Sequence, residues 1–250
     1  MFEVTREQVE KALVAVGIQV GDSLLVHSAV QYLGWPACGV GMYVDAILSV
    51  ISPGGTLAVP TFNFAFARGE DYDPQVTPSQ GMGAFSEYVR KHSLARRTAH
   101  PMQSLAVLGY YARDLALRDT PSAFDPRSAF ERMLELDFKA LLLGADVNAI
   151  SMLHYCEQRA NVPYRYWKEF TGRVRIPGGW ETRTYRMFVR NMEIDARLSL
   201  VSVQQHLEAL GQWSSVPFSY GQVSACRLID FVSAVDYFLS IDPWSLVTNH

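Results

Sequence analysis

The sequence predicts an α/β fold of three layers, in which helices flank a mixed, largely parallel sheet. Three observations support this prediction: helical and strand patterns alternate through the first third of the chain, several strand-like runs are continuously apolar, and an antiparallel hairpin pattern follows later. We expect a single domain over residues 1–250, with an α/β core at about 1–165 and an α+β remainder at about 166–250.

The first third of the chain contains two helix and strand pairs. Thr5 and Gln8 fit a capping box at the start of the first helix, and Gly17 fits the end of that helix. The four segments are a helix at 5–17, a strand at 23–30, a helix at 42–51 and a strand at 55–62. Strands that are joined through a helix tend to pair in parallel, which favours a largely parallel sheet.

The middle of the chain begins with a long loop at 63–82, which is rich in Asp, Pro, Gly and aromatic residues and has no periodicity. After the loop we expect a helix at 85–91, a strand at 103–109, short helices from 110 and from 125, and a strand at 139–145. Asp125 is predicted to cap the helix that Pro126 begins.

The sequence changes character after Trp167. Residues 172–191 alternate between charged and apolar side chains around a Pro-Gly-Gly turn, which predicts an antiparallel hairpin with one face in solvent. We interpret the hairpin arginines as a solvated face, with binding of a polyanion as the alternative; they are Arg173, Arg175, Arg183, Arg186 and Arg190. Helices at about 200–210 and 227–239 complete the prediction.

Composition narrows the class of protein. Of the 250 residues, 49% are hydrophobic, and a net charge of -3 gives no electrostatic reason to expect a nucleic-acid partner. Three cysteines at unrelated spacings indicate neither a disulfide framework nor a zinc site. The N-terminus does not resemble a secretion signal, and no stretch approaches the roughly 20 apolar residues of a membrane span. We therefore expect a soluble cytoplasmic protein with no membrane partner.

The strongest candidate for chemistry is the pair His154 and Glu157, which follows a buried run that ends at Gly144. On a helix the two side chains share one face, so the carboxylate could hold one imidazole tautomer while the other nitrogen accepts a proton. An isolated pair of this kind is more often incidental. Metal binding is disfavoured, because no further ligand stands at a suitable spacing.

The position of the pair supports a functional interpretation. Ligands of open α/β sheets bind at the carboxyl ends of strands, and two other polar turns, at His27-Ser28 and at Thr61, also follow predicted strands. The segment 96–101 adds two arginines, a hydroxyl and a histidine, which suit an anionic ligand. A solvated loop is the more common explanation of such a segment when it is considered alone.

Five segments together resemble the aminoglycoside 3-N-acetyltransferase family, also called the antibiotic N-acetyltransferases. The segments are VHSAVQYLGW, GVGMYVDAILSVISPGGTLAVPTF, QGMGAFSEYVRK, RRTAHPMQSLAVLG and LLLGADVNAISMLHYCE, and they cover most of residues 20–170. The resemblance implies an antibiotic N-acetyltransferase-like fold, acetyl-CoA as co-substrate, no metal, and a small-molecule amine as acceptor.

The resemblance also assigns roles to residues. The implied contacts with coenzyme A are His27, Ser28, Ala29, Val30, Thr61, Arg97 and Thr98, and the implied catalytic residues are His154, Glu157 and His100. This chain departs from the family pattern at Ala29, where a second serine is usual, and at Asn148 and Ser151, where an aspartate and a threonine are usual.

The implied reaction is direct acetyl transfer without an acyl-enzyme. His154, oriented by Glu157, would take the proton as the amine attacks the thioester, and N–H groups near Ser28 and Ala29 would stabilise the oxyanion. Cys156 is not expected to be a nucleophile, because its side chain points about 100° around the helix from His154.

The acceptor is expected to be an amino sugar, an aminoglycoside or a related biosynthetic amine. The basic and aromatic run 161–170 suits a neutral or anionic acceptor better than a polycation. Two alternatives stay open: a catalytically impaired CoA-binding or scaffold protein of the same fold, and a metal-dependent hydrolase that uses His154 and Glu157. The oligomeric state is also open, with a homodimer among the options.

Overall fold

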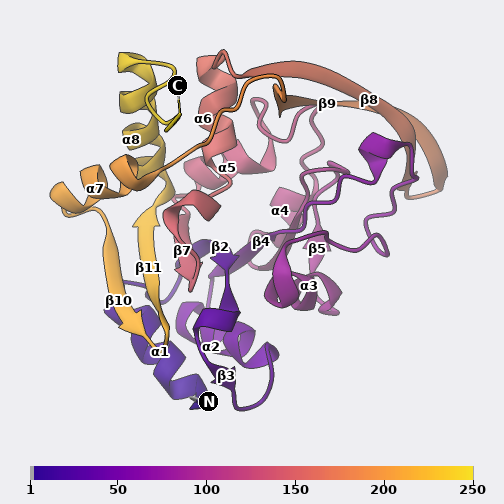
Figure 1. Ribbon diagram of the computed structural model, residues 1–250. Helices are drawn as coiled ribbons and strands as arrows, with labels where there is room; N and C mark the ends of the chain where they lie inside the picture. Colours follow the sequence, from indigo (N-terminus) through magenta and orange to yellow (C-terminus); the bar gives the residue numbers. More distant parts are fainter. Residues whose placement is uncertain (1–2, 250) are drawn as a thin grey trace.

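A computed structural model describes residues 3–249, which fold around a seven-stranded sheet (Figure 1). The strand order is β10-β11-β7-β2-β4-β6-β5. The strands are β2 (Ser23–Ser28), β4 (Thr56–Pro60), β5 (Arg96–Arg97), β6 (Leu105–Gly109), β7 (Lys139–Leu143), β10 (Ser214–Phe218) and β11 (Gly221–Arg227). A short parallel pair, β1 (Glu3–Val4) and β3 (Trp35–Pro36), lies outside this sheet.

The sheet is mixed, as predicted, but it is less parallel than expected. Only the central strands β7, β2 and β4 pair in parallel, and the outer pairings, β10 with β11, β11 with β7, β4 with β6 and β6 with β5, are antiparallel. A continuous apolar run reports that a strand is buried on both faces, but it does not report direction. The prediction of a largely parallel sheet is therefore corrected to a parallel centre with antiparallel flanks.

Helices cover both faces of the sheet, which confirms the three-layer prediction (Figure 1). The helices are α1 (Arg6–Ala15), α2 (Gly41–Ile51), α3 (Gly83–Lys91), α4 (Ala112–Ala116), α5 (Ala129–Glu135), α6 (Leu153–Ala160), α7 (Val201–Ala209) and α8 (Leu228–Ile241). One apolar core lies between the sheet and α1, α2 and α3, and a second lies between the sheet and α4 to α8. Successive residues of β2 alternate between the cores: Leu24 and Val26 face the first, and Leu25 faces the second.

Of the two predicted helix N-caps, one is confirmed and one is wrong. The capping box of Thr5 and Gln8 is formed as predicted. Helix α5, however, begins at Ala129, and Ser128 caps it by accepting a hydrogen bond from the Glu131 N–H. The predicted cap, Asp125, instead accepts bonds from three groups outside that helix: the Ser122 N–H, the Gln158 amide and Arg186.

The C-terminal part of the chain, from about residue 200, contributes strands to the main sheet and helices to its core. Strands β10 and β11 extend the main sheet next to β7, and α8 packs against α6. The hairpin of β8 (Arg165–Ile176) and β9 (Gly179–Arg190) forms its own two-stranded sheet. This hairpin reaches over to the long predicted loop, where Tyr72 pairs with Val174 and the short turn η2 (Phe66–Arg68) packs against Tyr185 (Figure 1).

Within residues 3–249, no helix has both the length and the apolar character that a membrane crossing requires.

Candidate active site

A sharp turn after β7 leads the chain into the helix that carries the candidate base. Gly144 has φ +71° directly after the strand, and a Cβ at this position would lie 2.6 Å from the Ala29 carbonyl oxygen. Glycine is therefore needed both for the backbone conformation and for the close approach of the turn that follows β2. The single turn η3 (Val147–Ala149) follows, and α6 then begins at Leu153.

The imidazole of His27 links the end of β2 to the start of α6. His27 Nε2 accepts a hydrogen bond from the Ser151 N–H at 3.0 Å and lies 2.9 Å from the Ser151 hydroxyl. Burial, and to a smaller extent the nearby His154, lower the pKa of His27 to about 3, so its ring is neutral at ordinary pH. His27 therefore positions the helix of the candidate base, and the geometry favours this structural role over direct coenzyme contact.

His154 and Glu157 form the pair that the sequence predicted. His154 Nδ1 lies 2.6 Å from Glu157 Oε2, with the histidine side chain 33% exposed and the glutamate side chain fully buried. Because an ionised carboxylate accepts hydrogen bonds only, we assign the proton to Nδ1, which leaves Nε2 with a free lone pair. The Phe124 ring packs edge-on against the imidazole at 5.7 Å. This arrangement can accept a proton at Nε2 and can stabilise the resulting imidazolium through Glu157.

Arg165 joins this pair from the first residue of β8, and no sequence signal pointed to it. Its Nε lies 2.9 Å from Glu157 Oε1, at an angle too bent for a good hydrogen bond, so the contact is an ion pair. Burial by itself would raise the pKa of Glu157, but the hydrogen bond and charge of His154 and the charge of Arg165 outweigh it and lower that pKa. The buried carboxylate is therefore held in its ionised form.

Other residues near α6 have structural roles. Asn148, one of the departures from the family pattern, accepts a hydrogen bond from the Leu200 N–H at 2.8 Å, just before α7. This bond requires an oxygen acceptor but no charge. Cys156 is fully buried, and burial raises the pKa of its thiol well above the ordinary value, which agrees with the prediction that it is not a nucleophile.

The predicted coenzyme contacts after β2 lie at the carboxyl end of that strand. Ser28 ends β2, Ala29 follows it, and Val30 begins the single turn η1 (Val30–Tyr32); each of the three is half-buried. The Ala29 N–H donates to the Leu143 carbonyl at 2.8 Å. It is therefore not free to bind an oxyanion, and the expectation that this N–H would do so is corrected.

The other predicted coenzyme contacts, Thr61, Arg97 and Thr98, form hydrogen bonds within the protein that link neighbouring strands. Arg97 Nε lies 2.9 Å from the Ser104 hydroxyl, and Arg97 Nη2 donates to the Thr61 carbonyl at 2.7 Å. Its Nη1 donates to the carbonyl of Thr77 in the long loop. The Thr98 hydroxyl accepts a hydrogen bond from the Leu105 N–H. All three nitrogens of Arg97 bind protein groups, so the geometry favours a structural role over recognition of a coenzyme phosphate.

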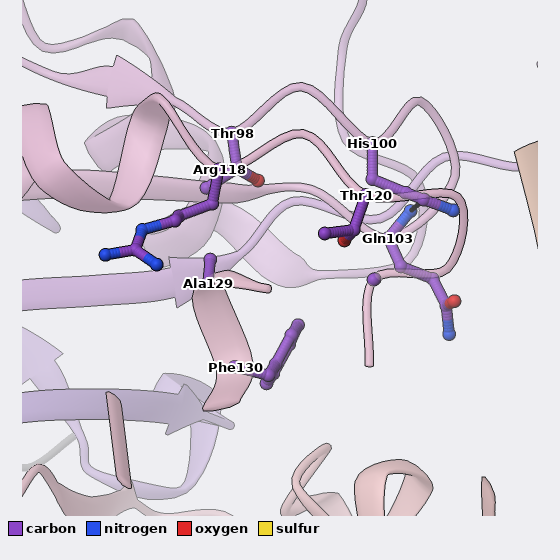
Figure 2. A pocket seen from close by; sticks show the side chains of 8 residues that line it. Thr98, His100, Gln103, Arg118, Thr120, Ala129 and Phe130 are labelled. Atoms are coloured by element: carbon purple, nitrogen blue, oxygen red, sulfur yellow. Dashed lines mark hydrogen bonds between the residues drawn. The ribbon is translucent and has the colours of Figure 1, made fainter. Parts of the chain in front are cut away.

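His100, the third predicted catalytic residue, is buried, and Asp125 and the backbone of Pro121 and Arg186 lie near its ring. Its Nδ1 accepts a hydrogen bond from the Gln103 N–H at 3.0 Å, and its ring packs edge-on against Tyr185. Burial lowers the pKa of His100 to about 4. Figure 2 shows it beside Thr120 and Gln103 in the lining of a cavity of only about 10 Å³, the space of about one water. The contacts of Nδ1 and of the ring favour a structural role, but the buried Nε2 has no hydrogen-bond partner within residues 3–249, and the catalytic role of His100 stays a prediction.

A larger pocket, of about 290 Å³, is lined by Phe124, whose ring packs against His154. The hairpin contributes Trp167 and Arg186 to its wall, and α6 contributes Tyr155 and Gln158. Arg186 lies over the Trp167 ring at 4.5 Å and also pairs with Asp125. The pocket combines aromatic surface with paired charges, which suits a polar ring with several hydroxyl groups.

The hairpin arginines are not a uniform solvated face. Arg173 pairs with Asp71, and Arg183 pairs with Asp119 and Glu181. These ion pairs cancel much of the positive charge of the hairpin arginines.

Among residues 3–249, no group of three or more His, Cys, Asp or Glu side chains is placed to hold a metal ion.

Comparisons with known proteins place the chain in a family. The model of the family described as aminoglycoside 3-N-acetyltransferase matches residues 25–240. The aminoglycoside N(3)-acetyltransferase III of Salmonella sp is 31% identical over 183 residues, which cover 65% of this chain and 63% of that relative, so less than two thirds of the relative's length is matched. The aminoglycoside N(3)-acetyltransferase VII of Streptomyces paromomycinus is 28% identical over 205 residues, with 74% and 70% covered.

Solved structures agree with the predicted fold. The structure described as AAC-IIIb binary with CoASH has a TM-score of 0.85 at 21% identity and covers 96% of this chain and 97% of its own. A sisomicin-bound AAC-VIa structure has a TM-score of 0.82 at 23% identity, with 96% and 99% covered. At these identities the likeness concerns the fold, while the family model extends over most of the sequence. The chain therefore belongs to the aminoglycoside 3-N-acetyltransferase family.

Proposed function

We propose that this protein is an acetyl-CoA-dependent N-acetyltransferase that moves an acetyl group directly to a primary amine. The observation that carries the proposal is the hydrogen-bonded pair of a partly exposed His154 and a buried Glu157 at the carboxyl end of a central strand. Family membership and the relatives' printed activities support it. The coenzyme serves as acetyl donor, and the chain's own residues supply the base.

His154 is proposed to act as the general base. An ammonium group has no lone pair, so the nucleophile is the neutral amine. His154 Nε2 takes a proton from the amine nitrogen as the C–N bond forms, and the imidazolium returns that proton to the leaving sulfur as the C–S bond breaks, which releases coenzyme A as a thiol. Glu157 holds the ring in the required tautomer through Nδ1 and stabilises the imidazolium that results.

Amine acceptors of the amino sugar or aminoglycoside class fit the proposal. The 290 Å³ pocket beside Phe124 has the mixed aromatic and polar lining that sugar rings favour. Its charges are largely paired, as in the contact of Arg186 with Asp125, so it lacks a strong acidic field for a polycation. We infer that singly charged amino sugars are better acceptors than aminoglycosides that carry many ammonium groups.

The test is amine-dependent release of the coenzyme A thiol from acetyl-CoA. We expect turnover with at least one member of a panel of aminoglycosides, amino sugars, sugar nucleotides and simple amines. His154→Ala should lower turnover by about 10²-fold to 10⁴-fold, while calorimetry still detects coenzyme binding. Unchanged turnover in that variant would remove His154 from its proposed role. Coenzyme binding without turnover across the whole panel would favour the scaffold alternative.

A further inference from the structure

The guanidinium of Arg165 lies against both members of the proposed catalytic pair. Its Nε is 2.9 Å from Glu157 Oε1, and its Nη2 is 3.4 Å from His154 Nδ1. The side chain is only 10% exposed. Its Nη1 donates to the Phe188 carbonyl at 3.3 Å, so the opposite strand of the hairpin also holds the guanidinium in place. Arg165 is thus fixed by the fold and is not a mobile surface arginine.

The two contacts of His154 Nδ1 cannot both be hydrogen bonds. An Nδ1 that carries a proton donates it to Glu157 at 2.6 Å and has no lone pair left to accept one from Arg165. The 3.4 Å contact therefore places a positive charge directly against the imidazole ring. Such a charge disfavours a second positive charge on that ring.

A carboxylate next to a base has two opposing effects. Glu157 orients His154, but a fully buried carboxylate 2.6 Å away also favours the imidazolium form of the ring. An imidazolium has no lone pair and cannot act as a base. The charge of Arg165 offsets that of the carboxylate, which weakens the preference for the imidazolium form while the hydrogen bond from His154 to Glu157 stays in place.

We propose that Arg165 is a positioning residue that lets Glu157 orient His154 while keeping the imidazole available as a base. The inference rests on the proposed role of His154 in acetyl transfer. It extends that role to the hairpin, because Arg165 is the first residue of β8. Other titratable groups around the pair include His27, at the end of β2, Tyr164, whose buried hydroxyl neighbours Glu157, and the buried thiol of Cys156, which also interacts with Glu157.

The test compares pH profiles of kcat/KM for the parent protein and for Arg165→Met, which removes the charge and keeps much of the volume. We expect the acidic limb of the profile to move to higher pH by about one unit, so that activity on that limb falls about tenfold while activity at high pH changes much less. Arg165→Lys, which restores the charge, should return the limb most of the way. A uniform loss at every pH, or an unchanged profile, would overturn the inference.

The matched control is Arg190→Met. Arg190 stands opposite Arg165 in the hairpin register but is exposed, so its removal should leave the acidic limb where it is. An equal shift in that variant would attribute the effect to general charge rather than to the Arg165 contact. If Arg165→Met does not fold, as judged by circular dichroism, Arg165→Gln removes the same charge with a polar side chain and serves as the test.

A spectroscopic readout separates this inference from the proposed function. In protein with ¹⁵N-labelled histidine, assigned with His154→Ala, the His154 ring should protonate at a higher pH in Arg165→Met than in the parent. This measurement needs no acceptor. If His154→Ala retains full turnover, the proposed function fails. If His154→Ala is inactive, but the His154 ring titrates identically in the parent protein and in Arg165→Met, only the present inference fails.

Discussion

Glu157 accepts a 2.6 Å hydrogen bond from Nδ1 of His154 although the glutamate side chain is completely buried. A carboxylate in that position is stable only because two positively polarised partners, His154 and Arg165, compensate for the loss of water. The hydrogen bond that helps to stabilise the buried carboxylate also sets the tautomer of the imidazole. Glu157 therefore contributes both to the stability of the fold and to the proposed chemistry.

Replacement of this carboxylate should damage both properties. Glu157→Gln leaves Arg165 without its buried partner, so we expect the free energy of unfolding to fall by about 3 to 5 kcal/mol. The variant should also lose about 10²-fold or more in kcat/KM, because the His154 tautomer is no longer held. Urea unfolding and thiol-release assays measure the two effects. Glu169→Gln, an exposed change on β8, is the control and should change neither quantity appreciably.

Acid should destabilise the fold through its buried histidines. Burial lowers the pKa of His27 to about 3 and of His100 to about 4, from an ordinary 6.5. Between about pH 6.5 and 4 the unfolded chain binds protons at these positions and the folded chain does not, so stability falls as pH falls, by about 1.4 kcal/mol per unit for each histidine. Urea unfolding at several pH values measures the slope. His100→Gln should reduce that slope, and an unaltered slope would contradict the assignment.

The close approach at Gly144 can be separated from its backbone strain. Gly144 and Gly211 have nearly the same positive φ, +71° and +68°, but a Cβ at Gly144 would meet the Ala29 carbonyl oxygen, whereas Gly211 faces open space. Gly211→Ala should therefore cost about 1 to 2 kcal/mol, the strain of the left-handed conformation alone. Gly144→Ala should cost about 1 to 3 kcal/mol more, from the clash. Equal losses in thermal unfolding would show that the turn moves freely.

Arg97 should prove to be a structural residue. Its nitrogens bind Thr61, Ser104 and the carbonyl of Thr77, so Arg97→Lys should lower the thermal midpoint by loosening the long loop. The Kd for coenzyme A, measured by calorimetry at a temperature where the variant is folded, should change less than about threefold. A large rise in that Kd without a loss of stability would restore the original interpretation of Arg97 as a coenzyme contact.

The cap of α5 offers a simple stability test. Ser128→Ala removes the hydroxyl that accepts a hydrogen bond from the Glu131 N–H, and it should cost about 1 kcal/mol. The exposed Ser93→Ala serves as the reference, with an expected change within about 0.5 kcal/mol. Similar values for the two variants in urea unfolding would argue against Ser128 as the cap.

Several parts of the structure could be predicted because their signals are local. The spacing of His154 and Glu157 places them on one helix face wherever that helix lies, and the capping box of Thr5 and the turn of the hairpin depend only on near neighbours. Even so, a local signal can have a competitor. Asp125 and Ser128 are both good caps, and tertiary contacts directed Asp125 to Arg186 instead.

The sequence by itself determined the three-layer α/β fold, the helix of the candidate base and the pairing of His154 with Glu157. Only the tertiary structure decided that β11 joins β7, that His27 holds Ser151, and that Arg165 meets Glu157. These contacts join residues brought together by packing of the whole chain, so no helix or strand period encodes them. Arg97 and His100 illustrate the same limit: their residue types suited a ligand, but in the folded chain the Arg97 guanidinium and Nδ1 of His100 bind protein groups.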